Sequence, residues 1–308
     1  MTSNYYSEPH DARTVEEAIR LFEVVGMPAR GLSGRTRVEY GNDLAEFARF
    51  LADRGLSQLG EVSLRHLEAY LAHLDGRGLK ASSTNRKAQT LKSFFRFLCD
   101  HGVLADNVAA RLIPPRIPRR EPRFLSESEY KELLRACSHS PRDAALVELL
   151  LQTGMRLSEV AGLTWADVEL PAKVTPDPEN VGYARITRKG GKVVLVPLNF
   201  KACRVLKTWK ATKHKREPGC DAVFVSKYGL GLSRRAIQDA VARHLATASI
   251  TGASVHSLRH TMATHHIARG TDLKTVQETL GHADLATTAL YVSLAKQAQK
   301  RALQEHAL

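Results

Sequence analysis

The proline-rich stretch IPPRIPRREPR, residues 113–123, limits the possible folds of this 308-residue chain more than any other feature. It contains four prolines, and proline lacks the backbone N–H that a continuing α-helix needs. Helical patterns of apolar residues occur on both sides of it. We therefore expect one domain over residues 1–113, an extended basic linker over residues 114–125 and a second domain over residues 126–308.

The first domain is expected to be a bundle of about four helices. Its apolar residues recur three or four positions apart, as Leu64, Leu67 and Leu71 do, and this spacing puts them on one face of a helix. Similar series lie at residues 44–51 and 91–98. Apolar stripes of this kind turn inward and pack against one another.

Two helix starts carry the sequence of a capping box. Glu17 follows Thr14 by three positions, and Glu129 follows Ser126 by the same interval. In such a box the hydroxyl accepts a hydrogen bond from the backbone N–H of the later residue, and the carboxylate accepts one from the backbone N–H of the earlier residue. We expect helices to begin directly after Thr14 and Ser126.

The second domain is expected to be α-rich with a small antiparallel sheet. Helical patterns lie near residues 127–137 and 142–152. The convincing β pattern is YARITRKGGKVVLVPL, residues 183–198, in which two β-rich runs flank a Gly-Gly pair. The predicted fold class of the whole chain is therefore mainly α.

The charge of the chain favours a polyanionic partner. Lys and Arg number 45 against 32 Asp and Glu, which leaves a formal net charge of +13. Such an excess is typical of proteins that bind DNA or RNA. The alternative is a basic surface that is simply solvated and binds no partner. For the basic linker, the alternative is a solvated tether between the two domains.

Cysteine usage and hydropathy argue for a cytoplasmic protein. The four cysteines lie far apart and form no CxxC pair, so neither a disulfide framework nor a cysteine metal motif is expected. The longest apolar run, ALVELLL at residues 145–151, is interrupted by Glu148 and is too short to span a membrane. We expect no membrane association.

The stretch VHSLRHTMATHH, residues 255–266, is rich in histidine and invites a metal site. His256, Arg259 and His260 share one face of the expected helix. A zinc-protease motif needs Glu after its first His, where this chain has Ser257, and Arg259 would repel a divalent cation. Arg beside imidazole suits a phosphate better. Histidines satisfied within a core remain the alternative.

Three further stretches carry polar residues of the same kind. TGMRLSEV, residues 153–160, offers a helix-breaking Gly before Arg156 with Glu159 three positions later. Lys189 lies at the tip of the expected hairpin, and LGHADLATTALYVSL, residues 280–294, supplies His282 and Tyr291. Taken singly, these have ordinary readings as a surface ion pair, a turn lysine and a packing tyrosine.

In this order the motifs resemble the tyrosine recombinase family, also called the phage integrase family, which includes Xer and Cre. The resemblance runs from about residue 33 to residue 300 and rests on TGxR, the hairpin lysine before VPL, HxLRHTxAT, LGH and the late tyrosine. The chain departs from the pattern beside the hairpin lysine, where many relatives have Gly and this chain has Arg188.

The resemblance implies site-specific cleavage and rejoining of DNA through a covalent 3′-phosphotyrosine, without metal or other cofactor. Tyr291 would be the nucleophile and Lys189 the general acid. His256 would accept the tyrosine proton or bind the phosphate, and Glu159 would orient the cluster. The implied catalytic residues are Arg156, Glu159, Lys189, His256, Arg259, His282 and Tyr291.

The resemblance further implies that the first domain is a SAM-like core-binding domain, and that both domains clamp double-stranded DNA at short inverted-repeat core sites, in the nucleoid. Residues from 294 onward would pack into a neighbouring subunit of a homotetramer, or of a hetero-tetramer with a paralogue; packing within the same chain is the alternative. The candidate DNA contacts are Thr36, Arg37, Arg86, Lys87, Lys92, Arg96, Arg116, Arg119, Arg120, Arg123, Ser233, Arg234 and Arg235.

Two other functions compete with recombination. A type IB-like topoisomerase shares this chemistry but relaxes supercoils, and a DNA-binding regulator would need only the basic clamp. A lambda-type arm-binding domain is not expected, because the chain begins only about 30 residues before the segment of the bundle that matches the family. The helix near residues 14–25 is expected as a small addition. Integration, excision, transposition and dimer resolution all remain open as outcomes.

Overall fold

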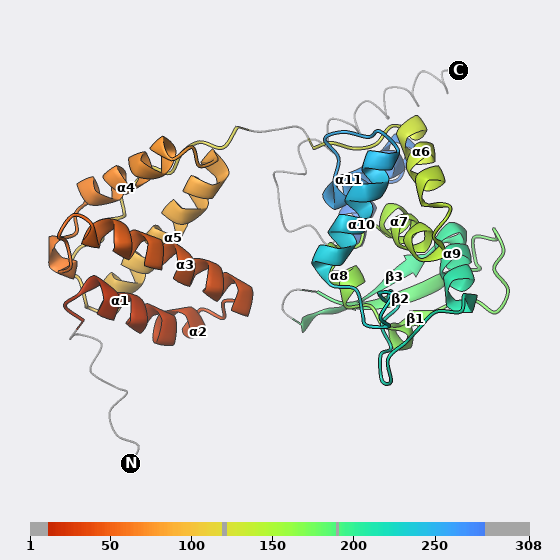
Figure 1. Ribbon diagram of the computed structural model, residues 1–308, viewed down its shortest axis with the longest axis horizontal. Helices are drawn as coiled ribbons and strands as arrows, with labels where there is room; N and C mark the ends of the chain where they lie inside the picture. Colours follow the sequence, from red (N-terminus) through yellow and green to blue (C-terminus); the bar gives the residue numbers. More distant parts are fainter. Residues whose placement is uncertain (1–11, 119–121, 189–190, 281–308) are drawn as a thin grey trace, which may run out of the picture. The chain divides into compact units, whose positions relative to one another are not determined.

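The computed structural model describes residues 12–118, 122–188 and 191–280 (Figure 1). The chain divides into two compact units, Met1–Arg119 and Arg120–Leu308, and each has its own hydrophobic core. The point of division lies within the proline-rich segment. The two units are described separately below.

The N-terminal unit is a helical bundle, as predicted. Its described helices are α1 (Val15–Leu21), a π-helical turn (Phe22–Gly26), α2 (Met27–Ala29), α3 (Gly34–Ala52), α4 (Leu64–Gly76) and α5 (Ala81–Asp100). Aromatic side chains fill the centre: Phe22, Phe47 and Phe94 are completely buried, and the ring of Phe22 meets that of Phe94 edge to face. The apolar stripes predicted from the sequence thus turn inward.

Both predicted capping boxes are present. The Thr14 hydroxyl accepts a hydrogen bond from the Glu17 backbone N–H (3.2 Å), and the Glu17 carboxylate accepts one from the Thr14 N–H (3.0 Å). The same pair of bonds joins Ser126 and Glu129, at 3.2 and 2.9 Å. Four helix-terminal donors are satisfied in this way, and α1 and α6 begin where the sequence predicts.

The C-terminal unit is α-rich with a small sheet, which confirms the predicted fold class. Its helices are α6 (Glu127–Cys137), α7 (Pro141–Thr153), α8 (Leu157–Ala161), α9 (Phe200–Ala211), α10 (Arg234–Thr247), α11 (Val255–Ala268) and α12 (Leu273–Leu280). Helix α7 packs against α6, α9, α10 and α11, and lies among them in Figure 1. It is the central helix of this unit.

The sheet contains the predicted hairpin and one short extra strand. Strands β2 (Gly182–Thr187) and β3 (Val193–Leu198) pair antiparallel in the register Gly182↔Leu198 to Thr187↔Val193. Strand β1 (Val168–Glu169) pairs with the other edge of β2. β1 is not predicted from the sequence, because a strand of two residues has no alternating pattern.

The apolar run at residues 145–151 is a buried part of α7. Glu148, the charge within it, is buried and accepts hydrogen bonds from the Tyr130 hydroxyl (3.0 Å) and the Gln152 amide (2.8 Å). These bonds offset the cost of removing a carboxylate from water. None of the helices in the described part of the chain combines the length and the apolar character needed to cross a membrane.

Candidate active site

Gly154 ends α7 and turns the chain toward the candidate arginines. Its φ of +59° is a left-handed conformation that glycine adopts without strain. A Cβ at this position would lie 2.5 Å from the end of the Met262 side chain and 2.7 Å from that of Leu280. The conformation therefore favours glycine here, and a larger residue would also have to displace these two side-chain ends. The Gly154 carbonyl accepts a hydrogen bond from the Arg259 guanidinium.

Arg156 begins α8 and is held by Glu159, as predicted. The Glu159 carboxylate accepts hydrogen bonds from the backbone N–H of Arg156 (2.7 Å) and from its Nη1 (2.9 Å). The Glu159 side chain is only 4 % exposed, whereas that of Arg156 is 40 % exposed. The buried carboxylate thus fixes the direction of an arginine that still reaches solvent.

Arg259 lies on α11 and is 8 % exposed. In addition to the Gly154 carbonyl it binds the carbonyl of Leu280 at the end of α12 (Nη2–O 2.5 Å). The last carbonyls of a helix have no partner within the helix, and a cation there is favourable. Arg259 therefore joins the ends of α7 and α12, directly beside the turn from which Arg156 projects.

The histidines of α11 fall into different surroundings. His256 is exposed, and His260, one turn further on, is half-buried. Burial lowers the pKa of His260, and the charges of His256 and Arg259 lower it further, so His260 is neutral near pH 7. His265 instead lies at hydrogen-bond distance from the Leu125 carbonyl (3.2 Å). Within the described ranges, no three His, Cys, Asp or Glu side chains gather as metal ligands.

The end of the β2–β3 hairpin adjoins the same cluster through Arg188, a residue not among the predicted ones. The backbone N–H of Arg188 donates to the Lys192 carbonyl (2.8 Å), and its guanidinium lies 3.5 Å from the Glu159 carboxylate. Burial lowers the pKa of Arg188, and the charge of Arg156 lowers it further against the opposing effect of Glu159. Its only sequence signal is the Arg where relatives have Gly.

The structure therefore brings together three arginines and one carboxylate: Arg156, Arg188, Arg259 and Glu159. The positive excess of this cluster suits an anion, and guanidinium groups bind phosphate oxygens in pairs. Three other predicted catalytic residues, Lys189, His282 and Tyr291, lie outside the described residues. His282 follows the Arg259-bound Leu280 by two positions.

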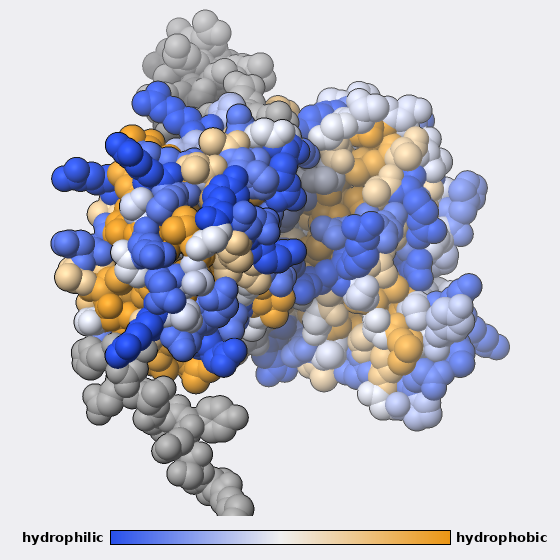
Figure 2. All heavy atoms as spheres, turned by 60° about the vertical axis from the view of Figure 1, so that its left-hand side comes forward, coloured by the Kyte–Doolittle hydropathy of each residue, from blue (hydrophilic) through white to orange (hydrophobic). Residues whose placement is uncertain are grey.

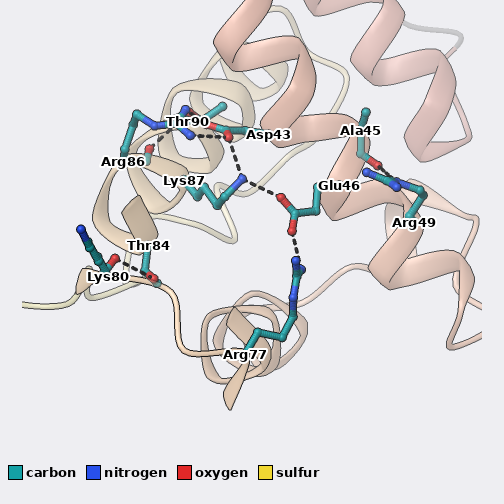
Figure 3. A network of polar contacts seen from close by, with 10 residues as sticks. All are labelled: Asp43, Ala45, Glu46, Arg49, Arg77, Lys80, Thr84, Arg86, Lys87 and Thr90. Atoms are coloured by element: carbon teal, nitrogen blue, oxygen red, sulfur yellow. Dashed lines mark hydrogen bonds and ion pairs between the residues drawn. The ribbon is translucent and has the colours of Figure 1, made fainter. Parts of the chain in front are cut away.

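In the N-terminal unit, two candidate DNA contacts belong to a network of ion pairs between α3 and α5 (Figure 3). The Asp43 carboxylate, 3 % exposed, binds both outer nitrogens of Arg86, the Lys87 ammonium (2.8 Å) and the Thr90 hydroxyl (3.0 Å). Glu46 binds Lys87 (2.6 Å) and, from its other oxygen, Arg77 (2.6 Å). Of the two candidate contacts, Arg86 is 42 % exposed and presents its side chain to solvent, whereas Lys87 is only 10 % exposed.

The Asp43→Ala substitution is expected to lower the free energy of unfolding of the N-terminal unit by about 3–5 kcal/mol, because it leaves the buried Lys87 ammonium with one carboxylate instead of two. Urea unfolding followed by circular dichroism measures this. Both tryptophans, Trp165 and Trp209, lie in the C-terminal unit. The unfolding transition followed by their fluorescence should therefore be the same in the variant as in the wild type. The matched control is Asp53→Ala at the exposed end of α3. Equal losses for both variants would contradict the expectation.

The other candidate DNA contacts differ in their exposure and in whether their side chains already bind another group of the protein. Lys92 donates to the Leu112 carbonyl (2.8 Å), and Arg123 binds Glu129. Thr36 pairs with Ser33 at the start of α3 (2.8 Å). Arg119 and Arg120 lie outside the described residues. The exposed candidates are Arg37, Arg86, Arg96, Arg116, Ser233, Arg234 and Arg235.

The surface of the N-terminal unit is polar with apolar patches between. Figure 2 shows hydrophilic side chains spread over the face of this unit that it presents, with hydrophobic side chains among them. Single exposed apolar residues such as Val24 and Val38, 67 % and 64 % exposed, are ordinary at a protein surface. This face therefore offers charged groups rather than one continuous apolar patch.

Comparison with known proteins identifies the family of the chain. The family model described as "Phage integrase family" matches residues 123–298, and "Phage integrase, N-terminal SAM-like domain" matches residues 27–102. The chain is 34 % identical to the tyrosine recombinase XerC of Natranaerobius thermophilus, with 85 % of this chain and 89 % of that protein covered. It is 33 % identical to the tyrosine recombinase XerD of Vibrio cholerae, with 90 % and 91 % covered.

Solved structures share the fold. A lambda integrase tetramer bound to a Holliday junction superposes with a TM-score of 0.72 at 20 % identity, covering 92 % of this chain and 78 % of that one. The XerH recombinase bound to a palindromic difH substrate, in a post-cleavage complex, gives 0.69 at 22 % identity, with 92 % and 83 % covered.

Proposed function

The chain belongs to the phage integrase family of tyrosine recombinases, and from this premise we propose that it cleaves and rejoins DNA at specific sites through a covalent 3′-phosphotyrosine intermediate. The observation that carries the proposal is the cluster of Arg156, Arg259 and Glu159 around the Gly154 turn. These are three of the residues that the sequence motifs single out, and Arg259 reaches the Gly154 turn from more than a hundred positions away.

The arginines stabilise the negative charge that develops on the phosphate oxygens. In the transition state the non-bridging oxygens carry more negative charge than in the starting phosphodiester, so fixed cationic donors bind the transition state more tightly. Arg156 is oriented by a buried carboxylate and Arg259 by two carbonyls, which means that neither side chain has to be ordered during the reaction. His282 is the third donor to the same oxygens.

The remaining roles concern protons. A phenol with a pKa of about 10 is a weak nucleophile at neutral pH unless its proton is removed. His256, exposed at the start of α11, takes the Tyr291 proton or binds the phosphate. Lys189 protonates the departing 5′ oxygen, which is otherwise a poor leaving group. The phosphotyrosine bond conserves the energy of the broken phosphodiester, and a second 5′-hydroxyl then attacks it.

Metal ions and nucleotides are not needed for this chemistry. Two arginines and a histidine supply the positive charge that metal ions supply in many phosphoryl-transfer sites. The energy for rejoining is held in the phosphotyrosine bond, so no nucleotide has to be hydrolysed. We therefore propose that the enzyme works without a cofactor.

The DNA partner is proposed to be a duplex with short inverted-repeat core sites, held in the nucleoid. Arg234 and Arg235 begin α10, where the helix terminus and the guanidinium groups both attract phosphate. In the N-terminal unit Arg86 is an exposed cation bound to Asp43, and its neighbour Lys87 is buried against the same carboxylate. The remaining candidate contacts are proposed to lie along the same duplex.

A tetramer on DNA suits exchange between two duplexes, because four strands must be cut. The lambda integrase structure described above is such an assembly on a Holliday junction. We propose that residues from 294 onward, outside the described residues, tie the subunits together in a homotetramer or with a paralogue. The outcome is then integration, excision, transposition or dimer resolution, according to where the sites lie.

The test begins with selection of bound duplexes from a random pool, since the target sequence is not known. Two labelled linear DNAs carrying a selected site are incubated with the protein in the presence of EDTA. We expect recombinant products of exchanged length, and no loss of activity compared with Mg²⁺. Tight binding to the selected sites without any cleavage would contradict the proposed function, and activity that EDTA removes would contradict the metal-free mechanism.

A further inference from the structure

Arg188 connects three segments of the C-terminal unit that are far apart in the sequence. Its guanidinium donates to the carbonyls of Thr279 (2.7 Å) and Glu278 (3.4 Å) in the last turn of α12. The same side chain lies 3.5 Å from the Glu159 carboxylate at the start of α8. Its own backbone closes the end of the β2–β3 hairpin. One residue thus touches the hairpin, α8 and α12.

The burial of Arg188 indicates that these contacts matter. Its side chain is 11 % exposed, and its Nε is buried without a hydrogen-bond partner among the described residues. Removing a guanidinium from water is costly unless its hydrogen bonds are replaced. An arginine that served only to keep the surface hydrated would be exposed to solvent and would not make these contacts.

Arg188 and Arg259 share the same target. The carbonyls of Glu278 and Thr279 bind Arg188, and that of Leu280 binds Arg259, so two guanidinium groups hold the end of α12. Glu159 is shared in the same way, since one of its oxygens binds Arg156 at 2.9 Å and lies 3.5 Å from Arg188. Arg188 therefore shares a carboxylate oxygen with Arg156 and the last turn of α12 with Arg259.

We propose that Arg188 is a positioning residue. Its guanidinium links the end of β2, Glu159 and the end of α12, and thereby fixes the positions of Arg156 and Arg259 relative to each other. The effect of Arg188 on cleavage rests on the proposed function, whereas the contacts that link the three segments do not depend on it. Lysine cannot replace Arg188, because one ammonium cannot span two helix carbonyls and a carboxylate. Alanine, which has no polar side-chain group, cannot make these contacts at all.

The first measurement is hydrogen exchange in the free full-length protein, which requires no cleavage. In Arg188→Ala the backbone amides of residues 276–280 are expected to exchange faster than in the wild type, because the last turn of α12 loses two of its three arginine contacts. The matched control is Arg185→Ala on β2, three positions earlier, whose side chain is exposed. Unchanged exchange in Arg188→Ala would overturn the inference whether or not the protein cleaves DNA.

The second measurement is the single-turnover cleavage rate on a selected site. Arg188→Ala and Arg188→Lys are expected to lose about tenfold or more with unchanged DNA binding, while Arg185→Ala keeps the wild-type rate. On a methylphosphonate at the scissile position, which lacks one negative oxygen, the loss should shrink because the arginine clamp matters less. A wild-type rate in Arg188→Lys, or an equal loss on both substrates, would overturn the inference. Absence of cleavage by the wild type would instead contradict the proposed function.

Discussion

Replacing Arg259 with alanine is expected to slow single-turnover DNA cleavage by about 10²–10³-fold while leaving DNA affinity within a few-fold of the wild type. The side chain is buried and fixed by the Gly154 and Leu280 carbonyls, so it is oriented before DNA arrives. Its removal takes away a donor whose bond to phosphate strengthens in the transition state. Ground-state affinity depends on many other phosphate contacts and should change little.

Two companion variants separate this effect from misfolding. Arg156→Ala should give a loss of the same order with little change in stability, because its side chain is 40 % exposed. Arg269→Ala removes an arginine at the end of the same helix α11, 71 % exposed, and should cleave like the wild type. The rates come from denaturing gels and the affinities from binding titrations. A parallel loss of cleavage and binding in Arg156→Ala and Arg259→Ala would indicate structural roles instead.

Replacing Tyr291 with phenylalanine is expected to abolish the covalent protein–DNA adduct entirely, with wild-type DNA binding and stability. Phenylalanine keeps the ring and removes only the oxygen that attacks phosphorus, so no second nucleophile of suitable strength remains. The measurement is adduct formation on a nicked site, from which the small leaving strand diffuses away and the reaction cannot reverse.

The matched control for Tyr291 is Tyr228→Phe, in which an exposed tyrosine of the C-terminal unit loses the same oxygen. It should form the adduct at the wild-type rate. A Tyr291→Phe protein that still carries out the biological function in cells would revive the reading of the chain as a DNA-binding regulator without catalysis.

Features that depend on neighbouring residues were predictable from the sequence. The capping boxes at Thr14 and Ser126 involve residues three positions apart, and the Gly154 turn needs only the end of one helix and the conformational freedom of glycine. The pair of Arg156 and Glu159 is local in the same sense. Patterns of this range determine the helix starts, the hairpin and the mainly α fold class.

Features that depend on packing between distant segments were not predictable. Lys87 has the sequence surroundings of a surface lysine, yet it is buried because α3 supplies the carboxylates of Asp43 and Glu46 from more than 40 positions away. Arg188 meets Glu278 and Thr279 across about 90 positions. The pairing of β1 with β2 joins residues 14 to 16 positions apart and is also non-local, over a shorter range. Neither the spacing of apolar residues nor the helix and strand propensities of individual residues indicate such contacts.

The most direct test of the central claim is to locate the bond between protein and DNA. The protein is incubated with a nicked selected site in EDTA, the trapped adduct is digested with protease and nuclease, and the modified peptide is identified by mass spectrometry. We expect a single 3′-phosphoryl nucleotide on Tyr291, within ALYVSLAK, residues 289–296. A nucleotide on any other residue, or cleaved DNA without a covalent adduct, would contradict the assignment of this chain as a recombinase acting through Tyr291.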